Sequence, residues 1–179
     1  VLTNTDITDA ARRDLAAGWT HLRRLYLDET QVTDAGLEAL LSVPTLEGLS
    51  LRGCDGITGE GLLRLASLPA LQQLALKDTA IDDAFMAYIG EFPGLVYLEV
   101  GPDVSDAGLH GLSELPHLTA LGLSGAGITD AALPSLPLAQ LRELVLIETN
   151  VTAEALLQQE QLGGLRMLYL RGPALSEPA

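Results

Sequence analysis

The side chains best suited to catalysis or metal binding are few in this 179-residue chain: one cysteine, three histidines and 24 acids. Cys54 could serve as a nucleophile once its thiol is deprotonated. The histidines, which could act as bases or metal ligands, are His21, His110 and His117. Catalysis or ligation requires such groups to converge at one point. Their chemistry therefore depends on the elements that position them.

Other chemistries are excluded by composition. The glycine-rich stretch Gly122 to Gly127 lacks the lysine that a phosphate-binding P-loop requires. A single cysteine excludes an internal disulfide framework and a multi-thiolate metal site, and it is compatible with a reducing cytoplasm. Ten Lys and Arg against 24 Asp and Glu give a net charge of -14, which disfavours nucleic acid partners. No apolar run approaches the ~18 residues of a membrane span, so no membrane insertion is expected.

Leucine accounts for 39 of the 179 residues, and its spacing reveals a repeat. The pattern Leu-x-x-Leu-x-Leu, with valine last in one unit, begins at Leu22, Leu46, Leu71, Leu95, Leu118, Leu141 and Leu165. The 23–25 residue spacing is typical of a solenoid in which neighbouring units share one core. We therefore predict a single array over residues 1–179, with a partial first unit over residues 1–21.

Each unit continues with the signals of a short helix. Good N-cap residues, whose side-chain oxygens can accept from backbone N–H groups, stand at Thr8, Thr33, Thr58, Asp82, Ser105, Thr129 and Thr152. An acid follows directly in five of these seven units, where the helix dipole favours it: Asp9, Asp34, Asp83, Asp106 and Asp130. Pro134 and Pro137 predict a turn or a 3₁₀ segment in one unit.

This pattern resembles the leucine-rich repeat family along essentially the whole chain. The stretch Thr30 to Leu37 (TQVTDAGL) is similar to its cysteine-containing and ribonuclease-inhibitor-like branches and to their bacterial relatives. The resemblance implies an α/β fold: a right-handed solenoid of about seven or eight repeats, with a parallel concave sheet and short convex helices. It also implies that Cys54 is buried, because that position in the cysteine-containing branch holds Cys or Asn.

The array separates the residues that could do chemistry. His21 and His117 hold the same position four repeats apart, which places them ~19 Å from each other at ~4.8 Å per strand. His110 falls in a helix on the convex side. We therefore expect no catalytic residue, no metal site and no cofactor.

Residues between the strand leucines point to the concave face, where the fold does not dictate their type. They suggest a central patch of Arg52, Lys77, Tyr97 and Glu99, and a C-terminal patch of Val145, Ile147, Met167 and Tyr169. Tyr26 shares the column of Tyr169 and completes the candidate partner-binding residues. Tyr, Arg and Met are enriched at interface cores, although scattered apolar residues also occur on any solvated sheet face.

The function that these features favour is non-catalytic binding of a protein partner through the concave face, by a monomer. One alternative is the substrate- or ligand-sensing region of a larger multidomain enzyme or signalling protein, and another is an architectural spacer. Neither end carries an evident polar cap. The uncapped start at Val1 is what we expect if the chain is cut from a longer protein or begins at a domain junction.

Overall fold

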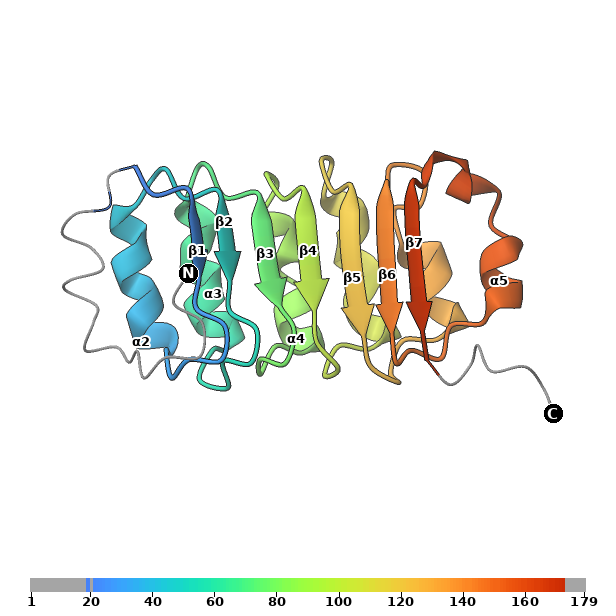
Figure 1. The fold of residues 1–179 in the computed structure, drawn as a ribbon, viewed down its shortest axis with the longest axis horizontal. Coiled ribbons are helices and arrows are strands. Elements are labelled where there is room, and N and C mark those ends of the chain that lie inside the picture. Colours follow the sequence, from blue (N-terminus) through green and yellow to red (C-terminus); the bar gives the residue numbers. More distant parts are fainter. Residues whose placement is uncertain (1–18, 20, 173–179) are drawn as a thin grey trace.

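The computed structural model describes residue 19 and residues 21–172, so the expectations for the partial first unit, Thr8 and Asp9 included, lie outside it. The described residues form a front layer of parallel strands and a back layer of short helical segments (Figure 1). Each of the first six strands is followed by a turn and by a helical segment that leads to the next strand. The chain winds as a right-handed, open α/β solenoid, and the predicted fold class is confirmed.

The described strands form one sheet in the order of the sequence, and every neighbouring pair is parallel. They are β1 (Arg24–Tyr26), β2 (Gly48–Ser50), β3 (Gln73–Leu76), β4 (Tyr97–Val100), β5 (Ala120–Ser124), β6 (Glu143–Ile147) and β7 (Met167–Arg171). The register aligns Tyr26, Ser50, Ala75, Glu99, Gly122, Val145 and Tyr169 in one row across the sheet. This is the row that the leucine spacing predicts.

The helical segments are short, and many of them are 3₁₀ turns. They are α2 (Asp34–Leu37), η2 (Glu38–Ser42), α3 (Gly59–Arg64), η3 (Leu65–Ser67), α4 (Asp83–Met86), η4 (Ile89–Glu91), η5 (Asp106–Glu114), η6 (Asp130–Ser135), α5 (Ala153–Leu157) and η7 (Glu160–Gly164). Segment η6 contains Pro134, as predicted. A 3₁₀ helix rises ~2.0 Å per residue against ~1.5 Å for an α-helix, so it returns along the strand with fewer residues.

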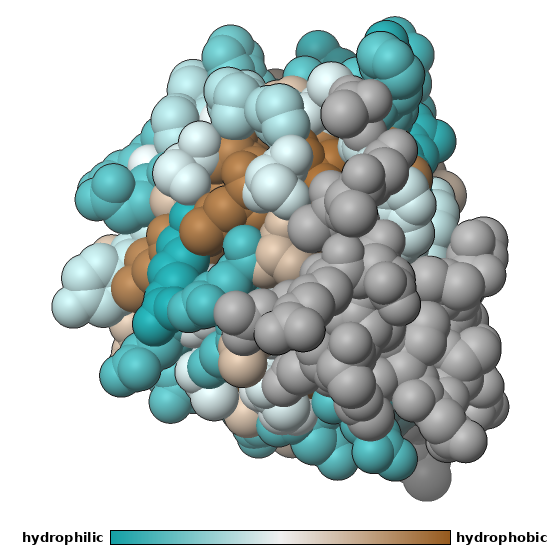
Figure 2. All heavy atoms as spheres, turned by 90° about the vertical axis from the view of Figure 1, so that its left-hand side faces the viewer, coloured by the Kyte–Doolittle hydropathy of each residue, from teal (hydrophilic) through white to brown (hydrophobic). Residues whose placement is uncertain are grey.

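The strand leucines form the centre of one continuous core. Those of the first six strands are at most 5% exposed: Leu25, Leu49, Leu74, Leu98, Leu121 and Leu144. The equivalent Leu168 of β7 is 43% exposed, because no further described strand covers it. Seen from the β1 end, hydrophobic residues are visible beside hydrophilic residues that border them (Figure 2).

In four repeats, the acid at the helix start also ties that repeat to the next. The Asp83 carboxylate accepts hydrogen bonds from the backbone N–H and the hydroxyl of Ser105, at 2.7 and 2.6 Å. The same arrangement joins Asp34 to Thr58, Asp106 to Thr129 and Asp130 to Thr152. Thr58 donates to Asp34 in the same way, but it accepts no cap hydrogen bond from α3, so the predicted side-chain cap is absent there.

Small residues in the following repeat make room for these acids. A Cβ on Gly61 would lie 2.2 Å from Oδ1 of Asp34, and a Cβ on Gly108 would lie 2.4 Å from Oδ1 of Asp83. Where the acid is replaced by Gly59, the next repeat fills the space with Phe85, whose Cβ would lie 2.9 Å from a Cβ at Gly59. Acid and small residue are therefore one packing unit that spans two repeats.

Small polar side chains after the strands are buried against the backbone. The hydroxyls of Thr30 and Thr79 donate to the carbonyls of Leu27 and Leu76, at 2.7 and 2.6 Å. Cys54 is fully buried, and its thiol lies 3.1 Å from the Leu27 carbonyl oxygen. The expected burial of Cys54 is confirmed, and its thiol is inaccessible to a substrate.

Candidate partner-binding face

The face of the sheet turned away from the helices, which we call the open sheet face, carries the candidate residues of both predicted patches. The sheet ladder holds its backbone rigidly, and the inward leucines between these positions fill the core. The side chains that point outward are therefore displayed on a fixed surface. This is the preorganisation that reduces the ordering cost of binding.

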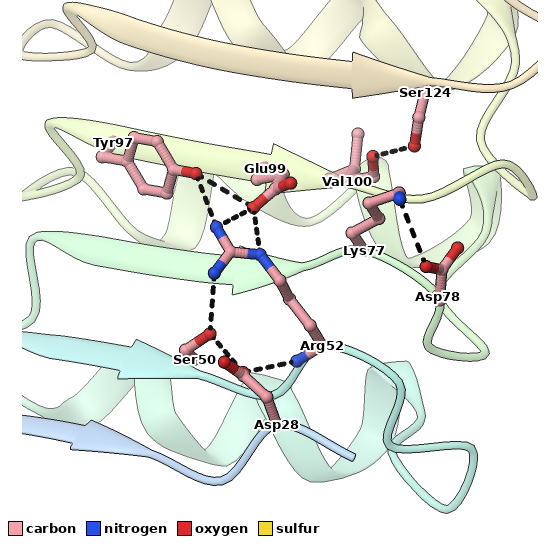
Figure 3. A network of polar contacts seen from close by, with 9 residues as sticks. All are labelled: Asp28, Ser50, Arg52, Lys77, Asp78, Tyr97, Glu99, Val100 and Ser124. Atoms are coloured by element: carbon pink, nitrogen blue, oxygen red, sulfur yellow. Dashed lines mark hydrogen bonds and ion pairs between the residues drawn. The ribbon is translucent and has the colours of Figure 1, made fainter. Parts of the chain in front are cut away.

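A polar network on β2 and β4 forms the centre of the N-terminal half (Figure 3). The guanidinium of Arg52 crosses β3 and donates to Oε2 of Glu99 at 2.6 Å and to the Tyr97 hydroxyl at 3.1 Å. The Tyr97 hydroxyl in turn donates to the same Glu99 oxygen at 2.9 Å. Arg52, Tyr97 and Glu99, predicted as one patch, are brought together as one hydrogen-bonded unit.

Two residues outside the prediction anchor the other end of Arg52. Its backbone N–H donates to Oδ1 of Asp28 at 3.0 Å, and Ser50 bridges the Asp28 carboxylate and the guanidinium. Ala75, which lies between Ser50 and Glu99 in the sheet, is small and only 4% exposed. A larger side chain there would obstruct the path of Arg52, so the short residues on β2 and β3 allow the network to form.

Burial and charge set the protonation states in this network. Burial alone would lower the pKa of the Arg52 guanidinium, but the hydrogen bond and charge of Glu99 outweigh it and raise that pKa. Burial, together with the Glu99 charge, raises the pKa of Tyr97 from 10.0 to about 12. At neutral pH the network therefore holds a charged guanidinium and a neutral phenol.

The raised pKa of Tyr97 predicts a pH-dependent contribution to stability. Because the folded pKa lies above the unfolded one, the contribution is complete below pH 10.0 and is lost between 10.0 and about 12. We expect the stability difference between wild type and Tyr97→Phe to shrink over that range in urea titrations. In folded protein, the ultraviolet signal of tyrosinate that Tyr97→Phe removes should emerge near pH 12. Its appearance at the ordinary pKa would contradict the network.

The other two candidates of this half of the sheet are Lys77, the remaining member of the central patch, and Tyr26, which was predicted separately. The Lys77 ammonium pairs with Asp78 at 3.4 Å. Tyr26 is 36% exposed and lines an open hollow of about 410 Å³, together with Arg52, Gln73 and Tyr97 among others. Lys77 is therefore not part of the hydrogen-bonded unit, whereas Tyr26 shares a surface depression with it.

The C-terminal patch forms a contiguous apolar surface on β6 and β7. The register places Val145 beside Tyr169 and Ile147 beside Arg171. Met167 and Tyr169 are 44% and 49% exposed, and Val145 and Ile147 are half-buried. The sheet thus brings the four predicted residues onto one surface, which is the kind of apolar area that partners cover.

The open sheet face carries charges of both signs. Its outward positions on the strands, and the outward positions that follow them, hold four bases, Arg24, Arg52, Lys77 and Arg171. The acids at such positions are three: Asp28, Glu99 and Glu143. Lys77 and Arg171 also pair with the acids Asp78 and Glu148, which adjoin these positions.

Metal-ligating and titratable side chains do not gather into a metal site in residue 19 and residues 21–172. No three His, Cys, Asp or Glu side chains there could hold a metal ion. His110 lies in η5, where its Nδ1 is 3.0 Å from the Ser135 hydroxyl. None of the described helices could cross a membrane by length and apolarity. The arrangement presents shape, hydrogen bonds and apolar area, which are the means of recognition.

A family model and several solved structures support the leucine-rich repeat. A family model described as "Leucine Rich repeat" matches residues 20–41 and 44–66. No curated protein matches the chain.

Among solved structures, internalin C2 from Listeria monocytogenes aligns with a TM-score of 0.62 and 24% identity, over 94% of this chain and 78% of that chain. A chain of the yeast Rad7–Elc1 complex aligns with a TM-score of 0.72 and 22% identity, over 93% of this chain and 46% of that one. The TLR13–ssRNA13 complex aligns with a TM-score of 0.54 and 18% identity, over 94% and 25%. The present chain therefore spans less than half of the latter two, and these likenesses establish the fold.

Proposed function

The chain is a leucine-rich repeat protein, and from that premise we propose that it is a non-catalytic module that binds a protein partner through the concave, open face of its sheet. The observation that carries this proposal is the contiguous apolar surface of Val145, Ile147, Met167 and Tyr169. Other exposed large hydrophobic residues among those described, such as Leu41, Tyr88 and Leu157, lie on separate helical segments or their connections. Clustering on a rigid sheet distinguishes a binding surface from scattered exposure.

The structural neighbours include one complex with a protein and one with RNA, and the charge of this chain distinguishes between these two classes of partner. The Rad7 structure is that of a complex with the protein Elc1, whereas the TLR13 structure contains single-stranded RNA. An RNA ligand would have to approach a chain of net charge -14, which repels phosphates. A protein can instead place apolar side chains against β6 and β7 and polar groups against the Arg52 network. The charge of this chain therefore favours protein over RNA.

A pair of double variants tests the proposal. The first pair, Ile147→Asp with Tyr169→Ala, changes the open sheet face. The control pair, Leu41→Asp with Tyr88→Ala, introduces the same two residue types in place of an aliphatic residue and a tyrosine on the helical side. We expect the first pair to weaken partner binding by about 100-fold, since two central contacts are lost, and the control pair to preserve it. The measurement is quantitative affinity capture from a lysate of the source organism, followed by titration of the captured protein. Capture of the same partners by both pairs would overturn the proposal.

A further inference from the structure

A narrow hollow on the open sheet face lies above β5. Its volume is about 50 Å³, and it is lined by Tyr97, Glu99, Ala120, Leu121, Gly122, Glu143 and Val145. The outward residues of β5 form its floor because Gly122 has no side chain and Ala120 has only a methyl group. The adjacent strands β4 and β6 lie about 9.6 Å apart, twice the strand spacing, so the hollow is one strand wide. We call it the β5 slot.

The lining of the β5 slot combines two kinds of group. Val145 and Ala120 provide methyl groups, whereas Glu99 and Glu143 provide carboxylates. Arg52 offsets the charge of Glu99 through a hydrogen-bonded ion pair. Glu143 is exposed, and within the described part of the chain its carboxylate has neither an ion pair nor a hydrogen bond. One uncompensated negative charge therefore remains beside an aliphatic surface.

We propose that the β5 slot receives a lysine or arginine side chain of the protein partner, an inference that rests on the proposed function. The methylene groups of that side chain pack on Val145 and Ala120, and its cationic head pairs with Glu143 near Glu99. Lys and Arg are the side chains that combine an aliphatic stem with a positive head. An acidic side chain would be repelled, and a neutral one would desolvate the Glu143 carboxylate without compensation.

The position of the slot also orders the partner's residues. Val145 belongs both to the slot and to the apolar surface of β6 and β7. A partner segment that inserts its basic residue above β5 therefore presents apolar residues to Ile147, Met167 and Tyr169. The partner segment that fits this face therefore carries a basic residue next to a cluster of apolar residues.

Two small probes test the slot separately from any partner. Nα-acetyl-lysine N-methylamide carries the aliphatic stem and the side-chain ammonium. Nα-acetyl-norleucine N-methylamide carries a similar aliphatic chain without charge. Both are titrated against protein with ¹³C-labelled methyl groups, and the Val145 and Ala120 signals are followed. We expect the lysine probe to produce saturable shifts at both residues and to bind about fivefold more tightly than norleucine, the value of a partly exposed ion pair.

Glu143→Gln should remove that advantage, whereas Glu60→Gln, an equivalent change of an exposed acid on α3, should leave it intact. Equal binding of the two probes, absence of saturable shifts, or an unchanged preference in Glu143→Gln would each overturn the slot. Such a failure would leave the capture experiment to decide on the binding face itself. Conversely, the lysine probe could keep its preference while both double variants capture the same partners. That result would overturn the proposed function and leave the slot intact.

Discussion

Leu121→Ala is expected to lower the free energy of unfolding by about 3 kcal/mol, the largest single-residue effect that the structure predicts. Leu121 lies on β5 in the row of core leucines that runs across the sheet, between Leu98 of β4 and Leu144 of β6. It is 1% exposed. Removal of its branched side chain leaves a cavity that the flanking repeats cannot close, because their own leucines are fixed by the same register. Urea unfolding followed by circular dichroism measures the change.

The matched control is Leu168→Ala, the same substitution in the same row at the last described strand. Leu168 is 43% exposed, so less apolar area returns to water and no enclosed cavity forms. We expect it to cost about 1 kcal/mol. Equal decreases in the free energy of unfolding for the two variants would contradict a core in which each repeat is packed by its neighbours on both sides.

Gly108→Ala is expected to cost about 2–3 kcal/mol, the second largest effect. The added Cβ would lie 2.4 Å from Oδ1 of Asp83 and 3.2 Å from its backbone Cα. Asp83 would have to move, and the hydrogen bonds that it accepts from Ser105 would be lost. Thermal or urea unfolding reports the loss.

Two companion variants isolate the cause. Gly163→Ala places the same methyl group where nothing lies within 4 Å, so it should be close to neutral. Asp83→Gly removes the clashing side chain, and its combination with Gly108→Ala should cost less than the sum of the single changes. Strict additivity, or a Gly163→Ala variant as unstable as Gly108→Ala, would show that acid and glycine are not one packing unit.

The repeat period made the sheet predictable, because a strand leucine must face the core in every unit. Leucine spacing alone gives Glu99, Gly122 and Val145 equivalent positions in successive repeats, and the ladder places them side by side. The helix starts were only partly predictable. The helix dipole explains Asp83 within its own repeat, and nothing within one repeat indicates that Ser105 depends on it. Comparison of acid and glycine columns across successive repeats could have revealed the coupling.

The side-chain network was less predictable than the surface that carries it. Columns identify which residues share a face, but not how far a flexible side chain reaches. Arg52 passes over β3 to Glu99, 47 residues away, whereas Lys77 on that intervening repeat turns to Asp78. Asp28 and Ser50 were missed because single polar residues in variable columns carry no pattern. Their roles follow from the path of the Arg52 side chain, which the sequence does not specify.

The central claim, that partners bind the open sheet face, is tested most directly by blocking it. Ala120→Cys places a thiol at the centre of that face, and Ala87→Cys places one on the helical side beside α4. The native Cys54 is 0% exposed and should not react with a bulky maleimide in folded protein. Binding of the captured partner is then measured before and after labelling of each variant. The account predicts that the label at position 120 abolishes binding and the label at position 87 preserves it; equal binding by both labelled proteins would contradict it.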